Sequence, residues 1–218
     1  MKLAPRCKLL FIGDSITDCG RDPTGNPTPW NPATSLGRGF VDLVAAHFGA
    51  VCPERAIRVM NRGVSGNTVR DLAARWETDV IDPAPDALVV MIGVNDVWRQ
   101  FDQPHVTEAH VPPDEYDRTL SALVSETRMR VREFVLMTPF FIEPNPADPM
   151  RRRMDEYGGM VKKIASRNGL TCVDTQAAFD TVLKHTHPMA IAWDRVHPNS
   201  VGHTILARAF LHAIGAPA

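Results

Sequence analysis

Two segments at opposite ends of the chain carry residue types that together could perform nucleophilic catalysis. Ser15 stands in the sequence Gly-Asp-Ser after a short apolar run, and Asp194 and His197 lie three residues apart near the C-terminus. A serine hydroxyl is a poor nucleophile at its ordinary pKa and needs a base within hydrogen-bond reach. His197 is our candidate for that base. Asp194 can reach the imidazole from the same turn, where it would fix the tautomer and stabilise the imidazolium that forms.

Acyl transfer also needs hydrogen-bond donors around the oxyanion of the transition state, each worth on the order of 3–4 kcal/mol. We expect these donors to be the backbone N–H groups of Ser15 and Gly66 and the side-chain amide of Asn95. A glycine fits position 66 because a Cβ atom would hinder close approach of the backbone to a substrate. Each segment alone has a structural alternative: a helix cap at Ser15, a loop hinge at Gly66, a turn at Asn95 and a surface ion pair between Asp194 and His197.

The elements that must position these residues follow from the apolar pattern. Five short apolar runs predict buried strands at 9–12, 57–60, 88–92, 134–137 and 170–173. Apolar residues at steps of three and four predict helices within 69–80, 116–127, 150–165 and 201–210. Alternation of strands and helices is typical of a parallel sheet covered on both faces. Ligands of such a sheet bind outside the carboxyl ends of its strands, where Ser15, Gly66 and Asn95 would lie.

Composition favours a globular protein and excludes several classes of partner. The 218 residues include 24 Lys and Arg against 25 Asp and Glu, and the near-neutral net charge of −1 argues against a nucleic-acid binder. No apolar run approaches the ~18 residues of a membrane span, and we expect no secretory signal because only four consecutive apolar residues precede Gly13 and Asp14. The four cysteines are scattered, as in a protein with reduced thiols. We therefore expect a single cytoplasmic domain over residues 1–218, with no membrane or nucleic-acid partner.

No metal or other cofactor is expected. Two histidine pairs have metal-like spacing, His105 with His110 and His185 with His187, but neither has a third ligand at a convincing distance in the sequence. The chain also lacks the glycine-rich patterns that bind nucleotides.

Three residues beside the proposed catalytic groups are candidates for substrate binding. Trp98 and Trp193 could stack on a sugar ring or line an acyl pocket, or they could pack under the loops. Arg99 could bind a sugar hydroxyl, or it could brace a loop through a carboxylate.

Taken together and in this order, four segments resemble the blocks of the SGNH (GDSL) hydrolase superfamily. They are Gly13–Thr17, Asn61–Asn67, Gly93–Asp96 and Asp194–Pro198. The resemblance covers essentially the whole chain and implies a three-layer α/β/α flavodoxin-like fold with a five-stranded parallel sheet. It also implies a metal-free, two-step acyl transfer to water. Within the blocks, Ser15 matches the nucleophile, Gly66 and Asn95 match the oxyanion donors, and Asp194 and His197 complete the triad.

A Gly-x-Ser-x-Gly elbow is missing, because the spacing around Ser65 is wrong. This disfavours an α/β-hydrolase fold with Ser65 as the nucleophile.

A narrower resemblance concerns four stretches that are similar to the intracellular acetyl-xylooligosaccharide esterases of this superfamily. They are Leu10–Gly20, Met91–Gln100, Met137–Phe140 and Ala192–Pro198. The similarity implies removal of acetyl groups from xylose units of imported oligosaccharides. Residues 21–36 are where we expect departures between members of the group.

Two other functions remain open. One is a broad short-chain carboxylesterase, thioesterase or lysophospholipase with the same triad. The other is a carbohydrate-binding or scaffold protein that kept the fold and lost the chemistry. A homo-oligomer is a further hypothesis, because the segments 21–36 and 141–149 form long loops with scattered apolar residues that could pack between subunits.

Overall fold

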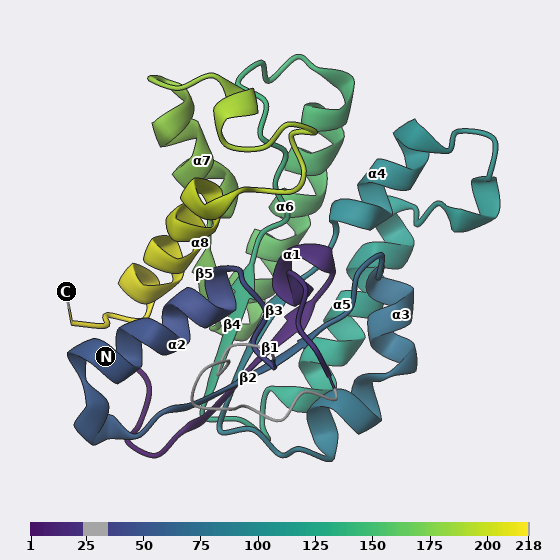
Figure 1. Ribbon diagram of the computed structural model, residues 1–218. Helices are drawn as coiled ribbons and strands as arrows, with labels where there is room; N and C mark the ends of the chain where they lie inside the picture. The colour runs from purple at the N-terminus through teal and green to yellow at the C-terminus, as the bar shows by residue number, and fades with distance from the viewer. Residues whose placement is uncertain (24–34, 218) are drawn as a thin grey trace.

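Five parallel strands form the centre of the protein in the computed structural model, which describes residues 1–23 and 35–217 (Figure 1). The strands lie in the order β2-β1-β3-β4-β5. Their bounds are β1 Lys8–Gly13, β2 Arg58–Gly63, β3 Ala87–Met91, β4 Glu133–Met137 and β5 Thr171–Val173. This is the flavodoxin-like strand order, in which the chain reverses its direction of travel across the sheet between β1 and β3. The predicted five-stranded parallel sheet is confirmed.

The strands are continuous apolar runs because both faces of the sheet are covered. All five residues of β3 and the Leu9–Ile12 segment of β1 are buried. The register aligns the ends of three neighbouring strands: Gly13 lies opposite Gly63 of β2 and opposite Met91 of β3. The loops that follow these strands therefore leave the sheet at one edge, beside the reversal point.

Helices cover the sheet on two sides (Figure 1). On one side α2 (Phe40–Val51) packs against α8 (Ser200–Ala213), and α7 (Thr175–Leu183) lies next to α8. The other side carries α3 (Val69–Ala74), α4 (Val94–Asp102), α5 (Pro113–Thr127) and α6 (Pro149–Asn168). A single-turn helix, α1 (Ser15–Asp18), follows β1. Short 3₁₀ turns occupy Pro53–Arg55, Thr107–Ala109 and Pro188–Ala190, and one π-helical turn occupies Glu77–Ile81.

The predicted helices differ from the observed ones in two ways. The apolar pattern over 69–80 predicts one helix, whereas α3 ends at Ala74 and is followed by the separate π-helical turn. The apolar pattern also does not predict the helices α1, α2, α4 and α7. Among them α4 matters most for function, because it begins directly after β3 and carries Asn95 in its first turn.

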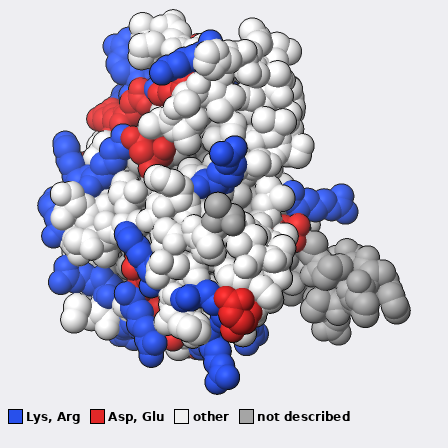
Figure 2. Space-filling view, turned by 90° about the vertical axis from the view of Figure 1, so that its left-hand side faces the viewer, with Lys and Arg blue, Asp and Glu red and all other residues white. Residues whose placement is uncertain are grey.

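The surface over α2 and α8 carries charges of both signs. Figure 2 shows Lys and Arg side chains spread over the left and lower parts of this face, with Asp and Glu side chains among them. In the described part of the chain, no helix combines the length and the apolar character that a bilayer crossing requires.

Candidate active site

Ser15 is the first residue of α1, at the carboxyl end of β1. The helix cap is the preceding residue: Asp14 accepts a hydrogen bond of 3.0 Å from the backbone N–H of Ile16. The alternative of Ser15 as a capping residue is therefore wrong, and its hydroxyl is left for another partner.

That partner is His197. The distance from Ser15 Oγ to His197 Nε2 is 2.9 Å, and the distance from His197 Nδ1 to Asp194 Oδ2 is 2.6 Å. With Asp194 ionised, the ring carries its proton on Nδ1 and presents a free Nε2 lone pair to the serine hydroxyl. The structure thus brings the three residues, which lie up to 182 positions apart, into one hydrogen-bonded chain.

The turn that carries Asp194 and His197 is fixed by its own hydrogen bonds. Asp194 Oδ1 accepts from the backbone N–H groups of Val196 and His197, at 2.9 and 2.8 Å. Burial by itself would raise the pKa of Asp194, but the hydrogen bonds from the His197 ring and from these two N–H groups outweigh it and hold the pKa below its usual value. Asp194 is therefore a carboxylate over the working pH range of such a triad.

Residues of a neighbouring loop bond to Arg195, in the middle of this turn. Arg195 has a left-handed backbone with φ of +62°. Its carbonyl accepts from the N–H of Ile142 at 2.9 Å, and its guanidinium donates to Glu143 at 2.5 Å and lies over the ring of Phe141. Phe141 and Ile142 are buried. The apolar residues at the start of the 141–149 loop, which we expected to be available for contacts between subunits, thus pack inside the chain.

The three expected oxyanion donors come from the ends of β1, β2 and β3. Within the described residues, no acceptor is recorded for the backbone N–H of Ser15 or of Gly66. The Asn95 amide donates to the carbonyl of Asn67 at 2.9 Å, which leaves its second N–H for a ligand. Gly66 has φ of +84°, and a Cβ atom there would touch nothing within 4 Å. No protein atom crowds this position, and its left-handed conformation favours glycine.

The aromatic and basic candidates have distinct surroundings. Trp98 packs edge-on against the ring of His197, with centroids 5.6 Å apart. Arg99 lies over the Trp98 ring at 4.7 Å and donates to Asp102 at 2.5 Å. Asp102 belongs to the same helix, so this pair braces no loop, and Arg99 also donates to Asn95 Oδ1 at 3.4 Å. Trp193 is 80% exposed and lies directly before Asp194, so a free aromatic surface adjoins the catalytic turn.

His203 is a neighbour of the site that the sequence analysis missed. It is buried, and its Nδ1 accepts from the backbone N–H of Phe40 at 3.2 Å. The neutral ring therefore carries its proton on Nε2, which faces Cys19 Sγ at 3.2 Å. Burial, with a smaller effect of His197, lowers the pKa of His203 to about 4, so it stays neutral and links α8 to α1 and α2. Its spacing from Leu206 and Phe210, on the buried face of α8, was the available signal.

Two carboxyl groups beside the site are buried away from water. Asp14 caps α1, and Asp96 accepts a hydrogen bond of 2.9 Å from the N–H of Val69 at the start of α3. The second carboxyl oxygen of Asp96 has no hydrogen-bond partner among the described residues. Burial raises the pKa of both groups to about 7.

We expect Asp96→Asn to reduce the loss of stability that accompanies rising pH. Between the unfolded pKa of about 4 and the folded pKa of about 7, folded Asp96 binds more protons than the unfolded chain. Its contribution to the free energy of unfolding is thus fully present below about pH 4 and lost as the pH passes 7. One pKa unit corresponds to about 1.4 kcal/mol. The variant should lose less stability than the wild type between about pH 5 and about pH 8, by a few kcal/mol in urea unfolding.

The control for this prediction is Asp114→Asn, at a carboxylate of α5 that is 78% exposed. It should leave the dependence of stability on pH as in the wild type. An Asp96→Asn protein with the wild-type dependence would contradict the assignment of the effect to Asp96.

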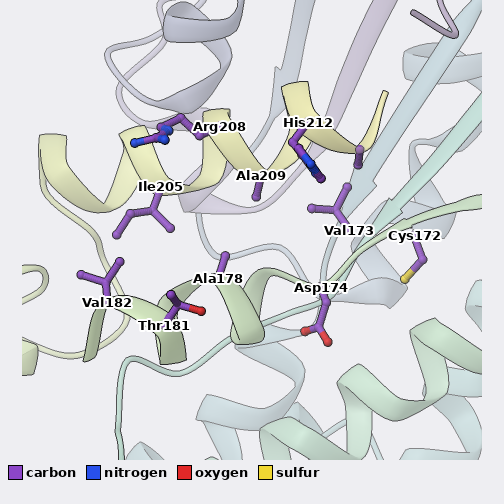
Figure 3. A pocket seen from close by; sticks show the side chains of 11 residues that line it. Cys172, Val173, Asp174, Ala178, Thr181, Val182, Ile205, Arg208, Ala209 and His212 are labelled. Atoms are coloured by element: carbon purple, nitrogen blue, oxygen red, sulfur yellow. The ribbon is translucent and has the colours of Figure 1, made fainter. Parts of the chain in front are cut away.

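A separate hollow of about 590 Å³ lies between α7 and α8, beside β5 (Figure 3). Ala178 and Val182 of α7 face Ile205 and Ala209 of α8 across it. Neither Ser15 nor the Asp194–His197 turn lines this hollow. Over residues 1–23 and 35–217, no three His, Cys, Asp or Glu side chains are grouped so as to hold a metal ion.

Known proteins have similar sequences and similar folds. Residues 11–205 match the model of the GDSL-like Lipase/Acylhydrolase family. An acetylxylan esterase from Geobacillus stearothermophilus is 57% identical over 215 residues, which make up 99% of this chain and 97% of the relative. The crystal structure of Axe2, an acetylxylan esterase from the same organism, covers 100% of this chain and 98% of its own, with 56% identity and a TM-score of 0.95.

Other solved structures agree. LAE5, an alpha/beta hydrolase enzyme from the metagenome of Lake Arreo, Spain, is 52% identical, with coverage of 99% of this chain and 98% of its own and a TM-score of 0.94. Three further Axe2 structures are described as catalytic mutants, in which a serine, an aspartate or a histidine is replaced by alanine.

Proposed function

Because this chain belongs to the GDSL-like lipase/acylhydrolase family, we propose that it is a serine esterase that removes O-acetyl groups from xylo-oligosaccharides. Family membership confirms the predicted SGNH resemblance and makes the chain a carboxylic ester hydrolase. The observation that carries the proposed mechanism is the hydrogen-bonded chain from Ser15 through His197 to Asp194. The substrate class is supported by the acetylxylan esterase that is 57% identical over nearly the whole chain.

In the first step Ser15 Oγ attacks the carbonyl carbon of the acetyl ester while His197 Nε2 takes its proton. The carbonyl π electrons move to the oxygen, which accepts hydrogen bonds from the N–H groups of Ser15 and Gly66 and from the Asn95 amide. Asp194 stabilises the imidazolium. As the tetrahedral intermediate collapses, His197 gives its proton to the sugar oxygen, the ester bond breaks, and the deacetylated sugar leaves.

In the second step a water molecule attacks the acetyl group on Ser15. His197 takes a proton from this water, the same donors hold the new oxyanion, and the proton passes to Ser15 Oγ as acetate is released. Each proton removed from a nucleophile is returned to a leaving group, so the enzyme ends the cycle unchanged. These steps use only side chains and backbone groups of this chain, and they call for no metal or cofactor.

A substrate panel tests the proposed function. Acetate release from acetylated xylobiose and xylotriose is compared with turnover of 4-nitrophenyl esters of increasing acyl length. We expect efficient release of acetate from the sugars and a steep fall in turnover as the acyl chain lengthens. Turnover of long-chain esters or thioesters without turnover of acetylated sugars would overturn the sugar assignment and favour the broad esterase, thioesterase or lysophospholipase alternative.

We infer that Trp193 contacts the sugar. Its exposed ring offers a flat apolar surface beside the catalytic turn, whereas Trp98 and Arg99 are engaged with His197 and Asp102. Trp193→Ala should raise the KM for acetylated xylotriose by about three- to tenfold, with little change in kcat. The kinetics with 4-nitrophenyl acetate should not change, because that ester has no sugar to stack.

The matched control is Phe101→Ala, a substitution at an exposed aromatic residue of α4 that the proposal does not involve. An equal loss with both substrates in Trp193→Ala would show that Trp193 supports the catalytic turn instead of the sugar.

Self-association, cytoplasmic location, a single domain and the role of residues 21–36 remain predictions. Residues 24–34 lie outside the described part of the chain. Light scattering of the purified protein tests the oligomeric state, with a monomer as the contradicting result.

A further inference from the structure

One arginine side chain donates to backbone carbonyls at the ends of β1 and β2, which lead to two of the three expected oxyanion donors, and reaches the third donor through Asn67. Arg75 follows α3 and is 16% exposed. Its Nη2 donates to the carbonyl of Gly13 at 3.0 Å, its Nη1 donates to the carbonyl of Arg62 at 2.8 Å, and its Nε donates to Asn67 Oδ1 at 2.7 Å. A single planar guanidinium thus joins the end of β1, the end of β2 and the loop after β2.

These three contacts lie close in sequence to the donors. Gly13 precedes Ser15 by two residues, and Asn67 directly follows Gly66. Asn67 has a second role, because its carbonyl accepts the hydrogen bond from the Asn95 amide. The path from Arg75 to Asn95 therefore consists of two hydrogen bonds, of 2.7 and 2.9 Å, through one residue.

We propose that Arg75 is a positioning residue for the oxyanion hole, which holds the donors of Ser15, Gly66 and Asn95 in the arrangement that the transition state needs. The inference rests on the proposed function, since it concerns the same site. Arg75 acts through its hydrogen-bond partners Gly13, Arg62 and Asn67.

The side chain must be arginine for geometric reasons. Its donors form a rigid planar fork, and here they serve three acceptors on separate segments as well as Asp79, at 2.6 Å. A lysine has one flexible ammonium group, which can keep the ion pair with Asp79 but cannot reach acceptors in three directions at once. Arg75→Lys therefore keeps the positive charge but removes the planar set of donors that bonds to three acceptors at once.

The experiment measures kcat and KM with 4-nitrophenyl acetate for Arg75→Lys, with Arg70→Lys as the control. Arg70 is on α3, is 40% exposed and also makes several hydrogen bonds, to Glu115, Glu108 and His110, but none to a segment of the site. We expect Arg75→Lys to lower kcat by between about tenfold and about 100-fold with little change in KM, since misplaced donors weaken transition-state binding. Arg70→Lys should behave as the wild type.

A double-mutant cycle with Asn95→Ala separates positioning from a general loss of structure. Asn95→Ala alone should lower kcat by about 10²- to 10³-fold. If Arg75 acts partly through the Asn95 amide, Arg75→Lys should cost clearly less in the Asn95→Ala background than in the wild type. Urea unfolding of each variant checks the fold, and Arg75→Gln is the second variant if Arg75→Lys does not fold.

Four results would overturn the inference. Wild-type kcat in Arg75→Lys would show that the donors do not depend on the guanidinium fork. Additive effects in the cycle would show that Arg75 does not position the Asn95 amide, and a loss of kcat matched by Arg70→Lys would show a general structural effect. Full activity of Asn95→Ala would show that the Asn95 amide is not an oxyanion donor, and it would count against the proposed mechanism as well. Activity retained by Ser15→Ala would contradict the mechanism only.

Discussion

Ser15→Ala will lower kcat/KM for acetyl esters by about 10⁴-fold or more, because it removes the atom that forms the acyl-enzyme bond. The residual rate will come from the oxyanion donors and from substrate binding, which alanine leaves in place. The fold should be intact, since the helix cap of α1 is Asp14 and the serine hydroxyl is bonded to His197 alone among the described residues. The measurement is steady-state hydrolysis of 4-nitrophenyl acetate and acetylated xylobiose.

Ser65→Ala is the matched control for this variant. Ser65 is also a serine beside the site, but its hydroxyl donates to Asp18 at 2.6 Å and it has no histidine partner in the described structure. We expect it to retain most of the wild-type activity. If Ser65→Ala were inactive and Ser15→Ala active, the nucleophile would be misassigned.

Asp194→Asn should lower kcat by about 10⁴-fold while leaving the turn in place. The asparagine oxygen can still accept from the backbone N–H groups of Val196 and His197. Its NH₂ group, however, would face His197 Nδ1, which can then only accept. The ring would have to carry its proton on Nε2, and it could no longer take the proton of Ser15.

The matched control is Asp148→Asn, at the cap of α6. Asp148 accepts from two backbone N–H groups in the same way, those of Met150 and Arg151, but no histidine of the described chain is bonded to it. Asparagine caps a helix about as well as aspartate, so this variant should keep wild-type kcat. Near-wild-type turnover by Asp194→Asn would show that the tautomer of His197 is not set by this residue.

The strands could be predicted because a parallel sheet buried on both faces leaves continuous apolar runs. β3 is the clearest case, with every residue buried. β2 shows the limit of this signal. The apolar run predicts a strand over 57–60, but β2 continues to Gly63 because Asn61 and Arg62 pair with Phe11 and Ile12 of β1. The strand ends where its pairing with β1 ends, and its polar last residues do not show the apolar pattern of a buried strand.

The helix α4 is the most consequential helix that the apolar pattern does not predict. Its apolar residues Val94, Val97, Trp98 and Phe101 recur at helical spacing, but they span only the nine residues of a short helix. Asn95 and Asp96 are buried in the same first turn, where they serve the site and the start of α3. The segment is therefore easier to recognise as a motif of polar residues than as a helix.

Residues of the site whose side-chain type performs the chemistry could be predicted from the sequence. A residue whose role depends on its position in space could not. The structure brings Ser15, Asp194 and His197 together as expected. Arg75 could not be found in this way, because two of its partners are backbone carbonyls, which every residue possesses. Its contacts become visible only in the structure, where the ends of β1 and β2 lie side by side.

Covalent labelling tests most directly whether Ser15 attacks acetylated xylo-oligosaccharides. The purified protein is treated with diethyl 4-nitrophenyl phosphate, with and without acetylated xylobiose in excess, and the labelled peptide is identified by mass spectrometry. We predict one phosphoryl group per chain, on Ser15, and labelling that slows as acetylated xylobiose is added. Labelling of another residue, or labelling of Ser15 at a rate that the acetylated sugar does not change, would contradict a Ser15 esterase that acts on these sugars.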